Sequence, residues 1–154
     1  MRTIIGIDPG SAVTGYGVIL PHKNQLTVVE YGVISTSPQQ PLCERIFHEL
    51  TAIIARLQPS EAAMETLFYS KNVRAALTLG HARGVEMLAL RNAEISIAEY
   101  SPREIKQSVT GNGNASKQQV QFMVQRLLSL KEKPQPLDAS DGLAIAICHY
   151  FRNG

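Results

Sequence analysis

The sequence predicts an α/β fold, a mixed sheet with helices on its faces. Three β-type segments come first, joined by short connections, which is the pattern of an antiparallel meander. Helical and strand-like segments then alternate to about residue 100, which predicts parallel strands with helices packed on the sheet. The 154 residues are 44% hydrophobic, enough for one domain with a full core and too few for two. We therefore expect residues 1–154 to form a single domain with five strands.

The first predicted strand, residues 3–8, contains an unbroken apolar run from Ile4 to Ile7. Such a run predicts a strand buried on both faces, in the middle of a sheet. Asp8 ends this strand, and a carboxylate there is costly to desolvate unless a positive charge meets it. Two more strands, at 13–20 and 26–34, complete the meander, with turn residues between them.

A helix is predicted over residues 42–57, because its apolar residues recur at steps of three and four. The proline and serine after it end this helix. A short buried strand at 62–65 follows and, like the first strand, ends in a carboxylate, Glu65.

A second, longer helix is predicted at about residues 71–92, and it is rich in small residues. Two of these, Gly80 and Gly84, are each unfavourable in a helix by roughly 1 kcal/mol relative to alanine. We infer that another backbone approaches this helix closely. That backbone belongs either to the sheet or to a second subunit.

Alternation predicts the last strand at residues 95–100, and a helix begins directly after it. Ser101 is its expected N-cap, Pro102 its first residue, and Glu104 completes a capping box. This helix is expected to stop before a flexible loop at 111–114.

A second capping box, Ser116 with Gln119, begins the next helix, which we expect to continue until Pro134 and Pro136 break it. The final helix is predicted to start near Asp138. Its expected buried residues are Leu143, Ile147, Cys148 and Phe151.

The net charge is only +2, but residues 71–133 contain ten Lys and Arg against five Glu, a local charge of +5. A polyanionic partner fits this excess, although ordinary solvated helix faces would also produce it. Cys43 and Cys148 have no metal-ligand spacing and are interpreted as buried thiols in a reducing cytoplasm. No signal peptide or membrane span is evident, so we expect a soluble, cytoplasmic protein.

Four carboxylates, Asp8, Glu65, Asp138 and Asp141, are the candidate chemical groups. Two of them end strands, and the other two lie three apart at a helix start, so that they share a face. If they converge, their mutual repulsion is tolerable around divalent cations, and oxygen-only ligands favour Mg²⁺ or Mn²⁺ over zinc. Two such ions could activate a water and stabilise a leaving oxygen in phosphodiester hydrolysis.

Each carboxylate also has a simpler explanation. Asp8 could belong only to a turn with Pro9 and Gly10. Asp138 could be an N-cap, with Asp141 complementing the helix dipole, and Glu65 could be a surface residue. Only the combination of the four points to catalysis.

Three other residues could contact DNA. Phe68 follows Glu65 in a predicted loop and could stack on an unpaired base, or could fold back into the core. Lys106 and Lys117 flank the 111–114 loop and could reach phosphates, although for either lysine alone a solvated surface position is the favoured interpretation. The glycines at 10–15 have P-loop spacing, but Tyr16 and Gly17 stand where Lys and Ser or Thr are required, so a Walker A site is excluded.

Several motifs resemble those of the RuvC-type Holliday-junction resolvases, in the same order and spacing over residues 3–150. The motifs are Gly6-Ile7-Asp8-Pro9-Gly10-Ser11, Thr14-Gly15-Tyr16-Gly17-Val18, Glu65 with Phe68, Lys71-Asn72, Gly80-His81-Ala82-Arg83-Gly84, Glu99-Tyr100-Ser101-Pro102-Arg103 and Asp138-Ala139-Ser140-Asp141-Gly142-Leu143-Ala144. The resemblance implies a ribonuclease H-like fold. It also implies an endonuclease that nicks two strands of a four-way DNA junction symmetrically, in recombination and repair.

By the same resemblance, Asp8, Glu65, Asp138 and Asp141 would form the active site and bind Mg²⁺ or Mn²⁺, with two ions per subunit. Phe68 matches the family's base-stacking aromatic, and Lys106 and Lys117 match its basic residues near the site. The small-residue helix matches the one that forms a homodimer. A branch-migration motor complex of the RuvA/RuvB type is the implied partner. Some family members extend beyond the position of Gly154 with a basic tail, so DNA contacts made by such a tail are left open.

Two rival interpretations of the sequence exist. Actin-like and sugar-kinase folds also open with a strand, an aspartate and a glycine turn, but they need a duplicated domain that 154 residues cannot hold. The second rival interpretation is a silent junction-binding module, that is, one without catalytic activity. The presence of carboxylates at all four positions argues against it, because crowded acids facing DNA would not help binding.

Overall fold

The computed structural model describes residues 1–35, 39–66 and 71–154. Five strands form one sheet in the order β3-β2-β1-β4-β5. β1 pairs antiparallel with β2, and β2 pairs antiparallel with β3, whereas β1 and β5 both pair parallel with β4. The strands are β1 (Ile4–Asp8), β2 (Val13–His22), β3 (Gln25–Ser35), β4 (Glu61–Glu65) and β5 (Ser96–Tyr100). The predicted mixed five-stranded sheet is therefore confirmed.

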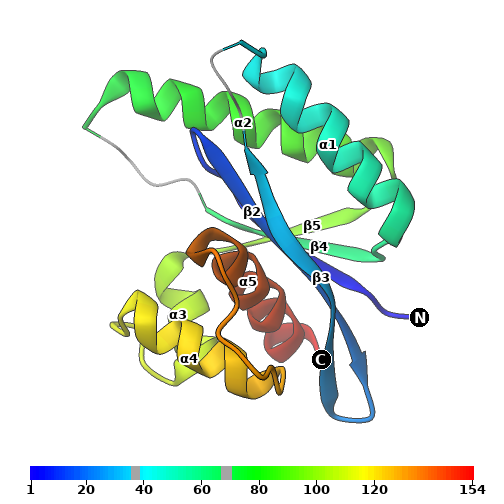
Figure 1. Cartoon of the computed structure of the whole chain (residues 1–154), viewed down its shortest axis with the longest axis vertical. Coiled ribbons are helices and arrows are strands. Elements are labelled where there is room, and N and C mark those ends of the chain that lie inside the picture. Colours follow the sequence, from blue (N-terminus) through cyan, green and yellow to red (C-terminus); the bar gives the residue numbers. More distant parts are fainter. Residues whose placement is uncertain (36–38, 67–70) are drawn as a thin grey trace.

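Helices cover both faces of this sheet (Figure 1). On one face lie α1 and α2, and on the other lie α3, α4 and α5, with α5 directly against the strands. The helices are α1 (Leu42–Leu57), α2 (Val73–Asn92), α3 (Pro102–Thr110), α4 (Lys117–Leu127) and α5 (Leu137–Asn153). Both predicted capping boxes are present, Ser101 with Glu104 and Ser116 with Gln119.

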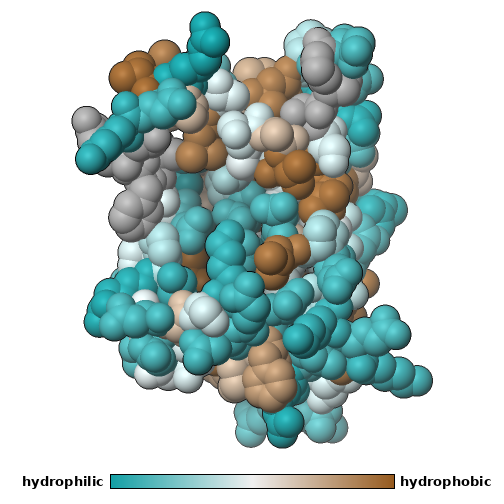
Figure 2. All heavy atoms as spheres, turned by 60° about the vertical axis from the view of Figure 1, so that its left-hand side comes forward, coloured by the Kyte–Doolittle hydropathy of each residue, from teal (hydrophilic) through white to brown (hydrophobic). Residues whose placement is uncertain are grey.

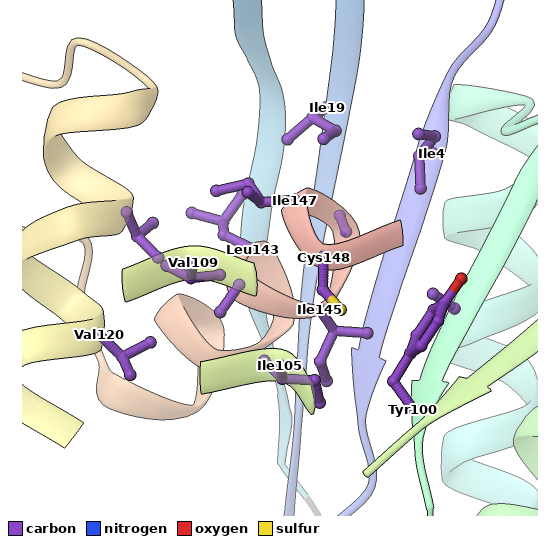
Figure 3. Close-up of a cluster of buried hydrophobic side chains, with 14 of the residues drawn as sticks. Ile4, Ile19, Tyr100, Ile105, Val109, Val120, Leu143, Ile145, Ile147 and Cys148 are labelled. Atoms are coloured by element: carbon purple, nitrogen blue, oxygen red, sulfur yellow. The ribbon is translucent and has the colours of Figure 1, made fainter. Parts of the chain in front are cut away.

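The predicted burial of the first strand on both faces is confirmed. Ile5 and Ile7 belong to the core under α1 and α2, whereas Ile4 belongs to the core on the α5 side, shown in Figure 3. Because side chains alternate along a strand, Asp8 points to the same face as Ile4, toward α5. The position of the first carboxylate therefore follows from the strand register.

Glycines let α5 lie unusually close to the sheet. A Cβ on Gly6 would come within 2.1 Å of the carbonyl oxygen of Gly142, and one on Gly15 within 1.8 Å of the carbonyl oxygen of Asp138. Any larger residue at these positions would push α5 away from β1 and β2. These glycines therefore set the distance at which the start of α5, with its two aspartates, meets Asp8.

Several details differ from expectation. Asp138 is not the N-cap of α5, because Pro136 occupies that position and no side chain caps the helix. α4 ends at Leu127, well before Pro134, and Ser129 follows it with φ of 52°. The 111–114 loop is held by hydrogen bonds from Gly113 N to Gln107 Oε1 and from Asn114 N to Asn112 Oδ1.

Two burial predictions were wrong. Cys43 is exposed, since it lies outside the set of α1 residues that face the sheet, whereas Cys148 is buried as expected. Phe151 is 49% exposed, because it lies near the end of α5, beyond the strands that cover the middle of that helix. Among the described residues, no atom lies within 4 Å of a Cβ added to Gly80 or Gly84, so the sheet is not the backbone that approaches them.

Candidate active site

The three aspartates of the chain meet at one edge of the sheet. Asp8 lies at the end of β1, and Asp138 and Asp141 lie in the first turns of α5. One carboxylate oxygen from each lies within 4.8 Å of the other two, and all three side chains are half-buried. The sequence predicted that these residues converge, and the packing of α5 on β1 brings them together.

Glu65 lies on the neighbouring strand, at the same edge. β4 runs parallel to β1, so both strands end where α5 begins. Asp8 and Glu65 share a hydrogen bond. Together with Asp141 they line a cleft of about 230 Å³, whose other lining residues are Pro102, Ile105, Lys106, Lys117, Val120, Ala144 and Ile145.

The carboxyl groups resist ionisation in this arrangement. Burial, followed by the charges of Glu65, Asp141 and Asp138, raises the pKa of Asp8 to about 8. Burial is also the main cause that raises the pKa values of Glu65 and Asp141, although both accept a hydrogen bond from Asp8. Among Asp8, Glu65 and Asp141, the pKa of Asp8 is therefore raised to about 8, so its carboxyl group holds a proton more tightly than an exposed aspartate does.

The two predicted lysines face this cluster. Lys117 Nζ lies 3.9 Å from Asp141 Oδ2, and its charge lowers the pKa values of both Asp141 and Glu65. The charge of Lys106, from α3, also lowers the pKa values of these two carboxyl groups, but less than that of Lys117 does. One basic side chain from α3 and one from α4 thus line the opposite wall of the cleft.

The donor set fits a hard divalent cation. Every candidate ligand atom is a carboxylate oxygen, and three of them already lie close enough to share one ion. Two lysines do not neutralise four crowded acids, and one carboxyl remains protonated near neutral pH. A cation would replace that proton and relieve the repulsion.

The comparisons with known proteins agree with this geometry. The family model described as crossover junction endodeoxyribonuclease RuvC matches residues 4–149. This chain belongs to that family. The predicted family and enzyme class, a nuclease that hydrolyses DNA phosphodiester bonds, are confirmed.

Individual RuvC proteins match over nearly their full length. The crossover junction endodeoxyribonuclease RuvC of Desulforamulus reducens is 51% identical over 149 residues, which is 95% of this chain and 91% of that protein. Among solved structures, Thermus thermophilus RuvC in complex with Holliday junction substrate superimposes with a TM-score of 0.91 at 33% identity, covering 99% of this chain and 94% of the other.

A more distant structure shows the fold alone. The yeast mitochondrial Holliday junction resolvase Ydc2 has a TM-score of 0.65 at 15% identity, over 97% of this chain and 78% of the other. The overall fold is therefore shared with a resolvase that has little sequence in common with this chain. This agrees with the ribonuclease H-like architecture that the RuvC resemblance implied.

Two further residues bear on the site: a predicted one, Phe68, and one that the sequence did not single out, Arg83. Phe68, the predicted base-stacking aromatic, lies outside the described residues. Arg83 was quoted only within a motif and given no role. The structure places its guanidinium against the main-chain carbonyl of Glu65 and the carboxylate of Glu99. No local pattern could have revealed this, because the contacting residues are 18 and 16 positions away.

Proposed function

We propose that this chain resolves Holliday junctions by metal-dependent nicking of two DNA strands. Asp8, Glu65, Asp138 and Asp141 are the catalytic and metal-binding residues in this proposal, with two Mg²⁺ or Mn²⁺ ions per subunit. The observation that carries it is the cluster of three aspartate oxygens within 4.8 Å, with Glu65 lining the same cleft as Asp8 and Asp141, in a RuvC-family protein.

The carboxylates give the reaction its geometry. When bound, divalent cations supply the charge that makes a water more acidic and stabilises the leaving 3′ oxygen. Asp8 is the central ligand, because β1 is the most buried strand and holds it rigidly. Glu65 and the two α5 aspartates surround it from different elements, so a phosphate that enters the cleft is met from two sides.

Lys106 and Lys117 would hold the phosphate. Their ammonium groups line the cleft opposite the acids and can contact the non-bridging oxygens, where negative charge increases in the transition state. Phe68 is proposed to stack on an unpaired base near the cut, following its match to the family's aromatic residue.

A homodimer would supply the two sites that symmetric cutting requires. Along α2, Val73, Leu77 and Leu88 are 70%, 59% and 53% exposed, and they recur on one helix face with Gly80 and Gly84 between them. In Figure 2, hydrophobic side chains are more common in the upper half of the face, where α1 and α2 lie, than over α3 and α4. A second α2 could pack closely at the two glycines.

The remaining proposals follow from family membership. We propose that residues 1–154 form a single ribonuclease H-like nuclease domain, which the single sheet of the described residues supports. We also propose a four-way DNA junction as the substrate, a RuvA/RuvB-type motor as the partner and the cytoplasm as the location. No helix in the described part of the chain is long and apolar enough to cross a membrane.

The test is a nicking assay on an end-labelled four-way junction with Mg²⁺, beside a linear duplex of the same sequence. Wild type is expected to cut the junction at symmetric positions and to leave the duplex nearly intact. Asp8→Asn and Asp141→Asn are expected to bind the junction but to lose at least about 10³-fold in cleavage rate.

Each alternative gives a different result. Equal cutting of junction and duplex would contradict the substrate, and undiminished cutting by both variants would contradict the site. Junction binding by wild type with no cutting in Mg²⁺ or Mn²⁺ would support the silent binding module. For the dimer, Leu77→Arg should yield a monomer in sedimentation and uncouple the two nicks, whereas a dimer that persists would exclude the α2 interface.

A further inference from the structure

One partly buried side chain of α2, Arg83, ties that helix to the end of β4. Its side chain is only 11% exposed although it belongs to a helix with an open outer face. Nη1 donates a hydrogen bond to the main-chain carbonyl oxygen of Glu65, and Nη2 lies 2.7 Å from Glu99 Oε1 on β5. The guanidinium therefore bridges the last residue of β4 and the neighbouring strand.

The sheet leaves Glu65 supported on one side only. β4 pairs with β1 as far as Met64, opposite Ile7, and no further. On the β5 side the pairing continues to Glu65 opposite Tyr100, and the Thr66 N–H bonds to the Tyr100 carbonyl at 2.9 Å. On the β1 side, Glu65 therefore lies one residue beyond the last paired residue of β4. Without a hydrogen-bond partner, its main-chain carbonyl would be unfavourable in this half-buried position.

We propose that Arg83 is a positioning residue that fixes the Glu65 main chain, so that the Glu65 carboxylate stays directed toward Asp8 and Asp141. Arginine suits this task because its planar fork can donate to the carbonyl and to Glu99 at the same time, whereas lysine offers a single mobile ammonium. The inference rests on the proposed role of Glu65 as a metal ligand.

Arg83 acts through the backbone in this proposal. The charges that shift the pKa of the Glu65 carboxyl are those of Asp141, Lys117 and Lys106, and the hydrogen bond from Arg83 goes to the carbonyl instead. Residues that orient metal ligands in this way commonly change metal affinity by 10- to 100-fold when they are removed. α2 would then carry the dimer contact on its outer face and the support of Glu65 on its inner face.

The test measures metal binding and local mobility as well as cleavage. Arg83→Met keeps the unbranched apolar stem of the side chain but removes the guanidinium and with it every donor. We expect it to bind Mn²⁺ about tenfold more weakly by calorimetry on the DNA-free protein. Hydrogen exchange should accelerate at the Thr66 amide and the adjacent β4 end and stay unchanged in α5. Cleavage should fall at low Mg²⁺ and recover at high Mg²⁺, while junction binding in Ca²⁺ stays within about twofold of wild type.

Two variants separate positioning from general stability. Glu99→Gln keeps an acceptor for Arg83 and leaves the carbonyl bond intact, so its metal affinity should match wild type. Arg83→Lys keeps one donor and should recover part of the Mn²⁺ affinity. Arg45→Ala, which removes an ion pair with Glu49 on α1 and does not touch the residues that line the cleft, controls for the loss of a surface arginine.

Unchanged Mn²⁺ affinity in Arg83→Met would overturn the proposal. Accelerated exchange throughout the chain in Arg83→Met and Arg83→Lys alike would also overturn it, since Arg83 would then be a general stabilising residue. Glu65→Gln distinguishes this failure from failure of the proposed function. If Glu65→Gln is inactive while Arg83→Met is normal, only the present inference fails. If Glu65→Gln binds Mn²⁺ and cleaves like wild type, the proposed site itself is wrong.

Discussion

The two ends of β4 carry the same residue in opposite surroundings. Glu61 begins the strand and Glu65 ends it, and both point to the face covered by α5, since they are separated by two full alternations. Glu61 meets hydrogen-bonding partners: Arg2 Nε lies 2.6 Å from Oε1, and His149 Nε2 lies 2.7 Å from Oε2. Glu65 meets Asp8 and Asp141 instead.

The difference appears in the ionisation of the two side chains. The hydrogen bond from Arg2, followed by that from His149, holds the pKa of Glu61 below its usual value. Burial, together with the charge of Asp141, raises the pKa of Glu65. One end of the strand is therefore a satisfied ion pair, and the other is a group of acids that two nearby lysines do not neutralise.

α5 serves both ends, with Asp138 and Asp141 in its first turns and His149 near its last. The pairing at Glu61 holds the helix and sheet together. The crowding at Glu65 opposes folding of the metal-free protein, since burial and like charge raise the pKa values there, and it suits the proposed site for a cation and a phosphate. Carboxyl groups crowded against other acids thus point to function here, whereas the ion-paired Glu61 points to structure.

The largest expected effect comes from the matched substitutions Glu65→Gln and Glu61→Gln. Glu65→Gln removes a proposed metal ligand and should lower the junction cleavage rate by at least about 10³-fold. Glu61→Gln should leave that rate within about threefold, since it lies at the far end of the strand, but should lower the free energy of unfolding by about 1 kcal/mol. Single-turnover assays measure the cleavage rate, and urea unfolding measures the free energy of unfolding. Similar cleavage losses in both variants would contradict the distinction between the two ends.

The lysines opposite the acids should give the next largest effect. Lys106→Ala and Lys117→Ala should each lower the cleavage rate by about 10- to 100-fold, because each ammonium lines the cleft that holds the phosphate. Lys131→Ala, an exposed lysine outside the cleft, is the control for total charge and should change cleavage little. Equal losses in all three variants would mean that the lysines act only through net charge.

The crowded end should also make the metal-free protein sensitive to alkali. Asp8, with its pKa raised to about 8, is protonated in the folded state and ionised in the unfolded state between its ordinary pKa and 8. Folding then binds a proton, so stability falls as the pH rises through this window, by at most about 1.4 kcal/mol per pH unit. Urea unfolding in EDTA at pH 6 and pH 8 measures it.

In that experiment Asp8→Asn should remove most of the pH slope, and saturating Mg²⁺ should flatten the slope of wild type. Some slope should remain in Asp8→Asn, because burial raises the pKa of Glu86 to about 7. Glu86→Gln identifies that contribution, since it keeps a partner for Thr14 Oγ1, which bonds Glu86 at 2.7 Å. An Asp8→Asn slope equal to that of wild type would refute the assignment of the proton to Asp8.

The ion-paired end of β4, at Glu61, should show the opposite pH dependence of stability, and this is the smallest effect expected. Because the pKa of Glu61 is lowered, its ion pair stabilises the fold above about pH 4.5 and is lost as the pH falls below that value. Arg2→Met should reduce stability at pH 7 by about 1 kcal/mol or less, and the difference from wild type should shrink at pH 3.5. A difference that is constant with pH would show that Arg2 acts by packing alone.

The sequence was informative wherever the cause is local. The five strands and the capping boxes at Ser101 and Ser116 follow from alternation and from side chains that bond within three residues. Asp8 and Glu65 could be placed at strand ends for the same reason. Errors occurred where burial depends on distant elements, as at Cys43 on the open side of α1 and Phe151 beyond the sheet.

By itself, the sequence determined the elements, the family and the four carboxylates. Only the tertiary structure decided how closely they meet, since that distance depends on the packing of α5 against Gly6 and Gly15. It also decided that Glu61 is paired while Glu65 is not, and that Arg83 supports Glu65. The physical reason is that both the desolvation and the charge interactions of a carboxyl group depend on neighbours within a few ångströms. Here those neighbours come from distant parts of the chain: His149 lies 88 residues from Glu61, and Asp141 is still farther in sequence from Asp8.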